Sequence, residues 1–249
     1  MSRWKAASIH FLISLIVFLG LLALILLLWY PGILFNVGGG WAGLRIVIAV
    51  DLILGPLLTL VVFKTGKPGL KFDLSCIGVF QVACMIAGMA IVYGERPLAV
   101  VLAYDTFYSV NTDELLEYER DPAILESIPG SYPKLVYVEL PASTIAADTA
   151  YLRSQFIGDP LYVQTENYRA FPEQAEDVRA VFRREENARR AASEAILEQV
   201  EEGCLFSRFV SSVASGFVCF DVESRRLNEF FETEVAPSVV VDTEAEEQS

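Results

Sequence analysis

The chain has 249 residues, of which 53% are hydrophobic and 20% are charged, and its mean hydropathy is +0.42. A soluble domain rarely averages so apolar, so part of the chain is expected to lie in lipid. The formal net charge of −13 argues against a nucleic-acid partner, because phosphate backbones require a basic face.

The charge is divided unevenly along the chain. Residues 1–95 carry six basic and three acidic side chains, whereas the rest of the chain carries 13 basic and 29 acidic side chains. We therefore expect a transmembrane anchor over residues 1–95, a small soluble α+β domain over residues 96–235, and an acidic disordered tail over residues 236–249.

Three apolar runs predict the helices of the anchor. They cover about residues 11–30, 42–63 and 74–93, each close to the ~20 residues that cross a hydrocarbon core. A cleaved signal peptide is the competing interpretation of the first run, but this run is longer than a typical signal-peptide core and no small-residue cleavage site follows it.

The positions of the basic residues predict the orientation. The N-terminus and residues 64–71 are both basic, so both are expected in the cytoplasm. Three spans then place the C-terminal domain on the opposite side of the membrane, which in a Gram-negative bacterium is the periplasm.

Asp51, inside the second apolar run, is the most unusual residue of the anchor. An ionised carboxylate in hydrocarbon costs at least ~2.5–3.5 kcal/mol, so Asp51 is expected to face another helix or water. Pro56 predicts a kink, Gly55 permits a close helix approach, and Thr59 can bond a freed backbone carbonyl. These residues form either a notch that binds a partner or a proton, or a helix-packing device, which is the simpler interpretation.

Two residues of the anchor are candidate partners of Asp51. One is Arg45, and the other is His10, the only histidine of the chain. His10 lies near the cytoplasmic end of the first run and is interpreted as an interfacial residue rather than a ligand.

Small residues in the third run suit close helix contact, either within the anchor or with another protein's helix. They are Cys76, Gly78, Ala83, Ala87, Gly88 and Ala90.

The acidic half predicts a mixture of strands and helices. Strands are expected over residues 98–104, 107–110, 135–140, 205–210 and 217–222, and helices from Asn111 and over residues 143–156, 172–202 and 225–231. Residues 172–202 have the clearest helical periodicity, and acids interleave the arginines there, which indicates a solvated face.

The four cysteines fall into two pairs. Cys76 and Cys84 lie in the third apolar run and are expected to be inert packing residues. Cys204 and Cys219 flank a predicted hairpin on the side assigned to the periplasm, where a disulfide is plausible. A turn near residues 214–216 does not place these two cysteines directly opposite, so a twist or a bulge is needed.

The sequence contains no familiar catalytic motif. It has no HExxH, no GxSxG, no Walker loop and no Rossmann fingerprint. We therefore expect neither an enzyme nor a metal site, and no cofactor.

Several segments of residues 1–97 together resemble the type IV pilin accessory proteins of the TfpX/TfpZ type. They are Met1-Ser-Arg-Trp-Lys-Ala-Ala-Ser-Ile-His10, Trp29-Tyr-Pro-Gly32, Asp51-Leu-Ile-Leu-Gly-Pro-Leu-Leu-Thr-Leu60, Lys71-Phe-Asp-Leu74 and Arg96-Pro97.

The resemblance implies an inner-membrane, chaperone-like protein that modulates the stability, assembly or retraction of a cognate major pilin. From the Asp51 notch and the charge break near residue 95, we expect the anchor to contact the pilin's transmembrane helix and residues 98–235 to contact its periplasmic head. The resemblance also places Asp51, Gly55, Pro56 and Thr59 in the family's intramembrane signature. The oligomeric state stays open.

Two other classes of function stay open as well. A membrane-anchored extracytoplasmic sensor or signalling subunit would share this architecture, although it would normally need a cytoplasmic output module. A proton-coupled membrane protein could use Asp51 as its proton carrier, although three spans with one buried acid provide few groups for a proton pathway.

Overall fold

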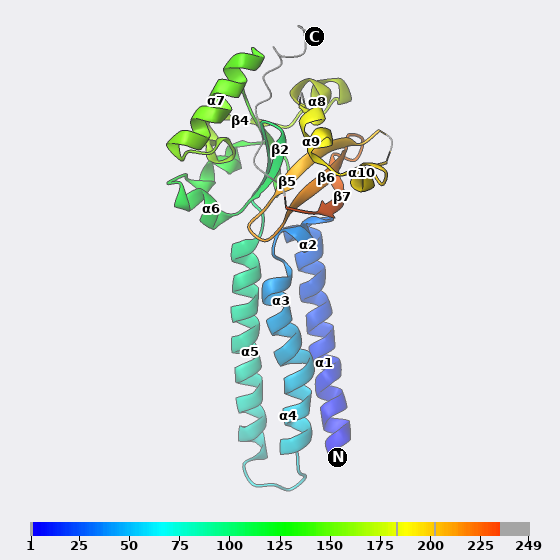
Figure 1. Ribbon diagram of the computed structural model, residues 1–249. Coiled ribbons are helices and arrows are strands. Elements are labelled where there is room, and N and C mark those ends of the chain that lie inside the picture. The colour runs from blue at the N-terminus through cyan, green and yellow to red at the C-terminus, as the bar shows by residue number, and fades with distance from the viewer. Residues whose placement is uncertain (1, 183, 202, 235–249) are drawn as a thin grey trace. The chain divides into compact units, whose positions relative to one another are not determined.

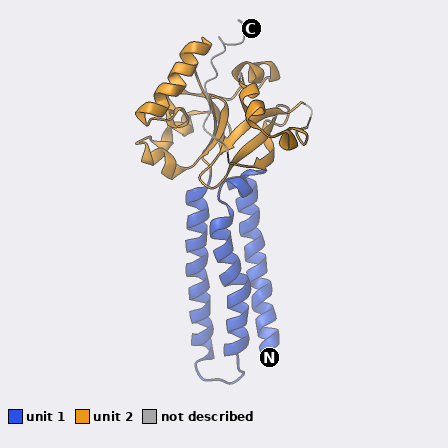
Figure 2. Ribbon diagram, in the orientation of Figure 1, with its two compact units in different colours: residues 1–96 blue, residues 97–249 orange. Residues whose placement is uncertain are grey.

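The computed structural model describes residues 2–182, 184–201 and 203–234. The chain separates into two compact units, residues 1–96 and residues 97–249 (Figure 2). The predicted acidic tail, residues 236–249, lies outside the described residues.

The first unit contains three long apolar helical segments (Figure 1). The first consists of α1, Arg3–Leu24, and a π-helical end, η1, Ile25–Trp29. The second consists of α3, Trp41–Val47, a π-helical stretch, η2, Ile48–Leu54, and α4, Gly55–Val62. The third is α5, Leu70–Glu95, and a short helix, α2, Leu34–Val37, precedes α3. By length and composition, each of the three segments can cross a membrane.

The helices extend beyond the apolar runs that predict them. α1 begins at Arg3 because the Ser2 side chain caps it, accepting a hydrogen bond from the Lys5 amide at 3.2 Å. α5 begins at Leu70, before the third run. An apolar run marks where a helix suits hydrocarbon, whereas the helix itself continues through polar residues that suit water and headgroups.

α3 and α5 pack closely in this unit. A Cβ atom added to Gly43 would lie 2.1 Å from the backbone oxygen of Gly88. Only glycine at position 43 lets the backbones of the two helices come this close. The prediction that small residues of the third run, here Gly88, make a close helix contact within the anchor is therefore confirmed.

The end of the first segment is tied to α5 by Tyr30. This residue is completely buried, and its hydroxyl donates to the backbone oxygen of Val92 at 2.8 Å. Its ring also packs edge-on against Phe35. The segment Trp29-Tyr-Pro-Gly32 therefore fixes one end of the bundle.

The second unit is built on a seven-stranded mixed sheet of order β4-β3-β1-β2-β5-β6-β7. Its strands are β1 Ala99–Ala103, β2 Thr106–Val110, β3 Lys134–Val138, β4 Tyr168–Ala170, β5 Leu205–Val210, β6 Ser215–Asp221 and β7 Arg226–Glu232. The pairs β1–β3 and β2–β5 are parallel, and the other neighbours are antiparallel.

Helices and short 3₁₀ turns connect these strands. They are α6 Thr112–Glu117, η3 Pro122–Ser127, α7 Thr144–Ile157, η4 Leu161–Val163, η5 Thr165–Asn167, α8 Ala175–Val181, α9 Glu185–Ala191 and α10 Glu194–Leu197. The α+β prediction for this half of the chain is confirmed.

The predicted helix start at Asn111 is confirmed in detail. The Glu114 amide donates to Asn111 Oδ1 at 2.9 Å, and the Asn111 amide donates to Glu114 Oε2 at 3.4 Å. The two residues form a capping box, so local chemistry alone determines where α6 begins.

The predicted single helix over residues 172–202 is wrong. α8, α9 and α10 are separate, because the chain leaves the helical region at Phe182 and again at Ala192 and Ser193. Separate helices let Val178 and Ala188 each reach zero exposure, so tertiary packing overrides the helical periodicity. The predicted pairs Glu185–Arg189 and Glu186–Arg190 are present within α9, at 2.7 and 3.6 Å.

The predicted helix over residues 225–231 is also wrong, because this segment is strand β7. The Asp221 side chain accepts hydrogen bonds from the amides of Glu223 and Ser224, at 2.7 and 3.1 Å, and this turn reverses the chain. Arg225, at φ +54°, completes the turn. Strand β4 has only three residues and was not predicted.

Candidate functional site

Four polar side chains from the three long segments meet inside the first unit. His10 comes from α1, Asp51 from η2, Thr59 from α4 and Gln81 from α5. Asp51, Thr59 and Gln81 are buried, and His10 is half-buried. We refer to these four residues as the bundle cluster.

Hydrogen bonds connect the members of the bundle cluster in a chain. Thr59 Oγ1 lies 2.5 Å from His10 Nδ1, and Gln81 Oε1 lies 2.8 Å from His10 Nε2. Because an amide oxygen can only accept, His10 Nε2 donates to Gln81. Gln81 Nε2 then donates to the Asp51 backbone oxygen at 3.4 Å. Both ring nitrogens of His10 therefore have a hydrogen-bond partner.

Asp51 is the least satisfied member of the cluster. Its side chain is 7% exposed, and its Oδ1 atom is buried without a hydrogen-bond partner. Leaving a buried acceptor without a donor costs ~1–3 kcal/mol, and a carboxylate costs more. Of the two predicted partners, Arg45 is exposed, and His10 is linked to Asp51 through Gln81.

The other predicted residues shape the space around this chain of hydrogen bonds. A Cβ atom on Gly55 would lie 2.1 Å from Gln81 Nε2, so Gly55 makes room for the Gln81 amide. Pro56 is half-buried in the first turn of α4, directly after η2. Thr59 bonds the His10 ring, whereas the sequence predicted a freed backbone carbonyl as its partner.

A cavity of about 320 Å³ adjoins the bundle cluster. Three members of the cluster, His10, Thr59 and Gln81, supply its polar lining. Its other lining residues are Ala6, Ile9, Ile13, Phe63, Leu74 and Gly78. The apolar walls of the cavity can therefore contact apolar side chains of a partner, and its few polar groups can hydrogen-bond polar atoms of the same partner.

The His10 ring is bonded to two other helical segments, so His10 belongs to the packing of the bundle. Gln81 is the member that sequence reasoning missed, although it is the most polar residue of the third apolar run. The usable signal was a polar residue within, or directly before, each apolar run, because such a residue requires a partner in hydrocarbon.

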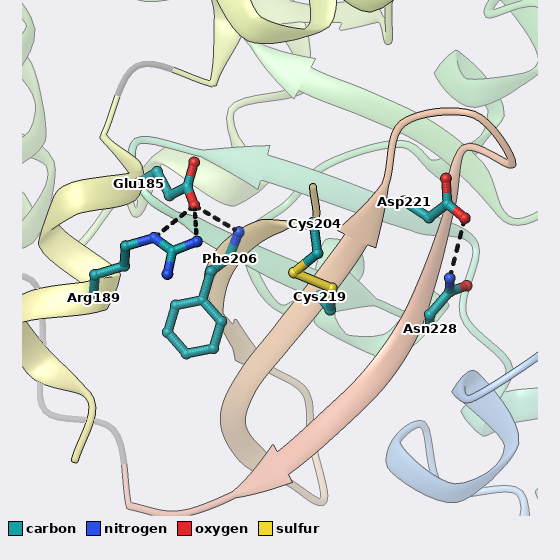
Figure 3. Close-up of a disulfide and its surroundings, with 7 residues drawn as sticks. All are labelled: Glu185, Arg189, Cys204, Phe206, Cys219, Asp221 and Asn228. Atoms are coloured by element: carbon teal, nitrogen blue, oxygen red, sulfur yellow. Dashed lines mark hydrogen bonds and ion pairs between the residues drawn. A yellow bond between two sulfur atoms is a disulfide. The ribbon is translucent and has the colours of Figure 1, made fainter. Parts of the chain in front are cut away.

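In the second unit, a disulfide joins Cys204 to Cys219 (Figure 3). Cys219 lies in β6 opposite Phe206, so the two cysteines are offset diagonally, with Cα atoms 5.5 Å apart. The register between β6 and β7 also shifts at Cys219. Beside the disulfide, Glu185 Oε1 accepts from the Phe206 amide at 3.3 Å and pairs with Arg189, which fastens α9 to β5.

A second cavity, of about 830 Å³, lies among β1, β3, α7 and the residue Arg184. On its wall, the Tyr104 hydroxyl donates to Asp148 at 2.9 Å, and Arg184 pairs with the same carboxylate at 2.8 Å. Burial and, to a lesser extent, this hydrogen bond to Asp148 raise the pKa of Tyr104 to about 12. These three side chains satisfy one another and stabilise the cavity wall.

Curated proteins of Dichelobacter nodosus are similar to this chain. The fimbrial assembly proteins of serogroup E1 and of serogroup I are each 34% identical to it over 125 residues, which is 49% of this chain and 48% of each relative. The fimbrial assembly protein of serogroups C1 and C2 is 34% identical over 115 residues, which is 45% of this chain and 87% of that relative.

The chain belongs to the fimbrial assembly protein family.

This finding confirms the resemblance to type IV pilin accessory proteins. The chain spans about half the length of the relatives of serogroups E1 and I. No model of a known protein family matches the chain. No solved structure matches it either.

Proposed function

We propose that this chain is an inner-membrane accessory protein of type IV pilus assembly that binds a cognate major pilin in a chaperone-like manner. The observation that carries the proposal is the cavity beside the bundle cluster, in a member of the fimbrial assembly protein family. Helices associate in a bilayer through close packing and interhelical hydrogen bonds, and the cavity offers a pilin helix both apolar walls and hydrogen-bonding groups. The role is non-enzymatic and requires no cofactor.

Two features support an orientation with the N-terminus in the cytoplasm and the second unit in the periplasm. The basic N-terminus and the basic residues 64–71 favour the cytoplasmic side. The disulfide Cys204–Cys219 suits an oxidising compartment. In this orientation the second unit is available to the pilin head.

The outer face of α5 offers a further contact for a pilin helix. Gly88 is buried against Gly43, but Ala83, Ala87 and Ala90 are exposed. Small exposed residues allow a second helix to approach closely in a bilayer. We assign these alanines and the cavity to the pilin helix.

The first test is a gene deletion in the host with immunoblots of total pilin and of sheared surface pili, complemented by the wild-type gene. Deletion should reduce surface pili and change total pilin. Unchanged amounts of both would contradict the proposal and favour the sensor alternative.

A matched pair of glycine variants tests the cavity itself. Gly78 lines the cavity and Gly94 does not, and a Cβ atom on either residue meets no atom within 4 Å. Gly78→Leu should fill the cavity and reduce both surface pili and the pilin that co-purifies with the tagged protein. Gly94→Leu should leave both unchanged. Equal effects of the two variants would remove the cavity from the proposal.

Exchange of the pilin head tests the role of the second unit. A pilin with its own helix and a foreign head should be handled less well than the cognate pilin. If both pilins were assembled equally, the contact with the second unit would be refuted, and the helix contact would remain.

A further inference from the structure

One face of α7 in the second unit exposes large apolar side chains. Ile145 is 74% exposed, Leu152 41%, Phe156 87% and Ile157 60%. Scattered apolar residues are normal on a protein surface, but a continuous patch along one helix usually marks an interface. These residues are therefore candidates for a contact with another molecule.

The opposite face of α7 packs against the rest of the unit and lines part of the larger cavity. Ala147, Tyr151 and Ser154 are buried, and the Tyr151 ring stacks on Tyr104 with centroids 4.2 Å apart. Asp148, the only acid of α7, is bonded to Tyr104 and Arg184. The inner face thus fixes which residues point outward.

The exposed face has no acidic residue in a half of the chain with 29 acidic and 13 basic side chains. Its one charged residue is Arg153. The Thr149 hydroxyl donates to the Ile145 backbone oxygen at 2.7 Å, so this side chain needs no water to satisfy it. The exposed face therefore carries no acidic charge and a single basic one.

The residues of this face have the same spacing whether α7 is followed from its N-terminus or from its C-terminus. Ile145, Thr149, Leu152 and Phe156, which we call the α7 stripe, follow one another at intervals of four, three and four residues. Two such stripes fit together antiparallel, with Ile145 of each helix against Phe156 of the other and Thr149 against Leu152. This symmetry is what a two-fold contact between identical chains requires.

We propose that the α7 stripe pairs antiparallel with the α7 stripe of a second copy of this chain. Taking roughly 200 Å² for a fully exposed large side chain, Ile145, Leu152 and Phe156 bury about 400 Å² per copy. The total of about 800 Å² is the size of a weak, transient interface. Confinement of two anchored copies to one membrane raises their effective concentration, so an interface of this size is sufficient. The proposal does not depend on pilin binding.

Cysteine crosslinking of the full chain in membranes tests both the contact and its direction. Cys76 and Cys84 are first replaced by serine, because both are free thiols. Ile145→Cys and Phe156→Cys are then made in two differently tagged copies. When the two are co-expressed, oxidation should yield a mixed dimer at least five times more abundant than the dimers that either variant forms alone.

Two controls define the surface. Val213→Cys places a thiol at another exposed apolar position and should give no more than background dimer. Leu152→Asp, added to both tagged copies, should reduce the mixed dimer at least five-fold.

Salt should raise the yield of the mixed dimer, because it screens the repulsion between two acidic units.

Three outcomes would overturn the proposal. Self-crosslinks of Ile145→Cys and of Phe156→Cys as strong as the mixed one mean parallel packing. Crosslinks to a protein of another mass, such as a pilin, mean a different occupant. A yield that falls as salt rises means a charged contact.

Discussion

The bundle cluster depends on single residues whose roles can be separated. Gly55 is required by one neighbour, since its missing Cβ atom makes room for the Gln81 amide. The amide in turn bonds His10 and the Asp51 backbone. The effects of substitutions at these positions on the free energy of unfolding should therefore be coupled rather than additive.

Gly55→Ala should lower the free energy of unfolding by ~1–3 kcal/mol, because its Cβ atom displaces the Gln81 amide. In a Gln81→Ala background the same substitution should cost almost nothing, because the clashing atoms are gone. Denaturation of the four variants in detergent measures this coupling. An equal cost in both backgrounds would show that Gly55 acts through something other than Gln81.

Asp51→Asn distinguishes packing from proton transfer. The side chain keeps its shape, and a buried carboxylate oxygen without a partner is replaced by a neutral amide. We expect surface pili within two-fold of wild type and an unfolding free energy that does not fall. Loss of pili at a normal protein level would support the proton-carrier alternative.

Tyr104 should make the second unit sensitive to alkali. The pKa of its phenol is about 12 in the folded chain, above its value of about 10 when unfolded, so the unfolded chain loses this proton first. The stabilisation is complete below pH 10 and is lost as pH rises to 12. Burial raises the pKa values of Tyr108, Tyr162 and Tyr168 in the same direction.

Unfolding free energies of the wild type and of Tyr104→Phe, measured from pH 9 to 12, test this prediction. The variant should lose stability less steeply with pH, because it cannot release the proton. Identical slopes would assign the alkaline loss to the other tyrosines alone.

At the scale of the helices, the contact between α3 and α5 should be intolerant of any added atom. Gly43→Ala puts a Cβ atom 2.1 Å from the Gly88 backbone oxygen, which cannot move aside without shifting α5. We expect a loss of ~1–3 kcal/mol or more in unfolding free energy.

Gly20→Ala is the matched control on α1, because its Cβ atom meets no atom within 4 Å. It should be neutral or stabilising by up to ~1 kcal/mol, since alanine favours the helix. Equal destabilisation by both substitutions would contradict the close contact between α3 and α5.

Elements defined by local chemistry could be predicted from the sequence. The capping box of Asn111 and Glu114 determines the start of α6, and hydrocarbon-length apolar runs predict the three long segments. Elements decided by the sheet could not. The helical periodicity of residues 172–202 did not indicate where the chain breaks into α8, α9 and α10, of which α9 and α10 pack against β5 and β6.

The same division applies to the candidate site. Asp51 is conspicuous in a sequence because a charge in hydrocarbon is costly, and Gly55 and Thr59 follow it closely. Gln81 and His10 belong to the cluster because of how their helices are rotated about their own axes. A helix with apolar residues on every side has no sequence pattern that specifies this rotation. The cavity between them is a property of three helices together.

At the scale of the whole molecule, the state of the cysteines reports the side of the membrane on which the second unit lies. In the periplasm, Cys204 and Cys219 should be joined and resist alkylation until they are reduced. In the Cys76→Ser, Cys84→Ser background, a maleimide mass tag should therefore add nothing before reduction and two labels after it. Two labels before reduction would place the unit in the cytoplasm.

Removal of this disulfide should lower the unfolding free energy of the second unit by ~3 kcal/mol, the chain-entropy value for a loop of about this length. Cys204→Ser, Cys219→Ser and the double variant should be equally destabilised, since each breaks the same bond. A larger loss in the double variant would show that the cysteines contribute separately.

The strand order of the second unit has a consequence for synthesis. β1 and β2, the first strands to be made, lie in the interior of the sheet, and the later strands add on both sides of them. β3 can cover one side soon after, but the edge of β2 waits for β5, which begins only at Leu205. For most of the time that this unit takes to emerge, its β2 edge is an open strand, which is the kind of surface that pairs with foreign chains.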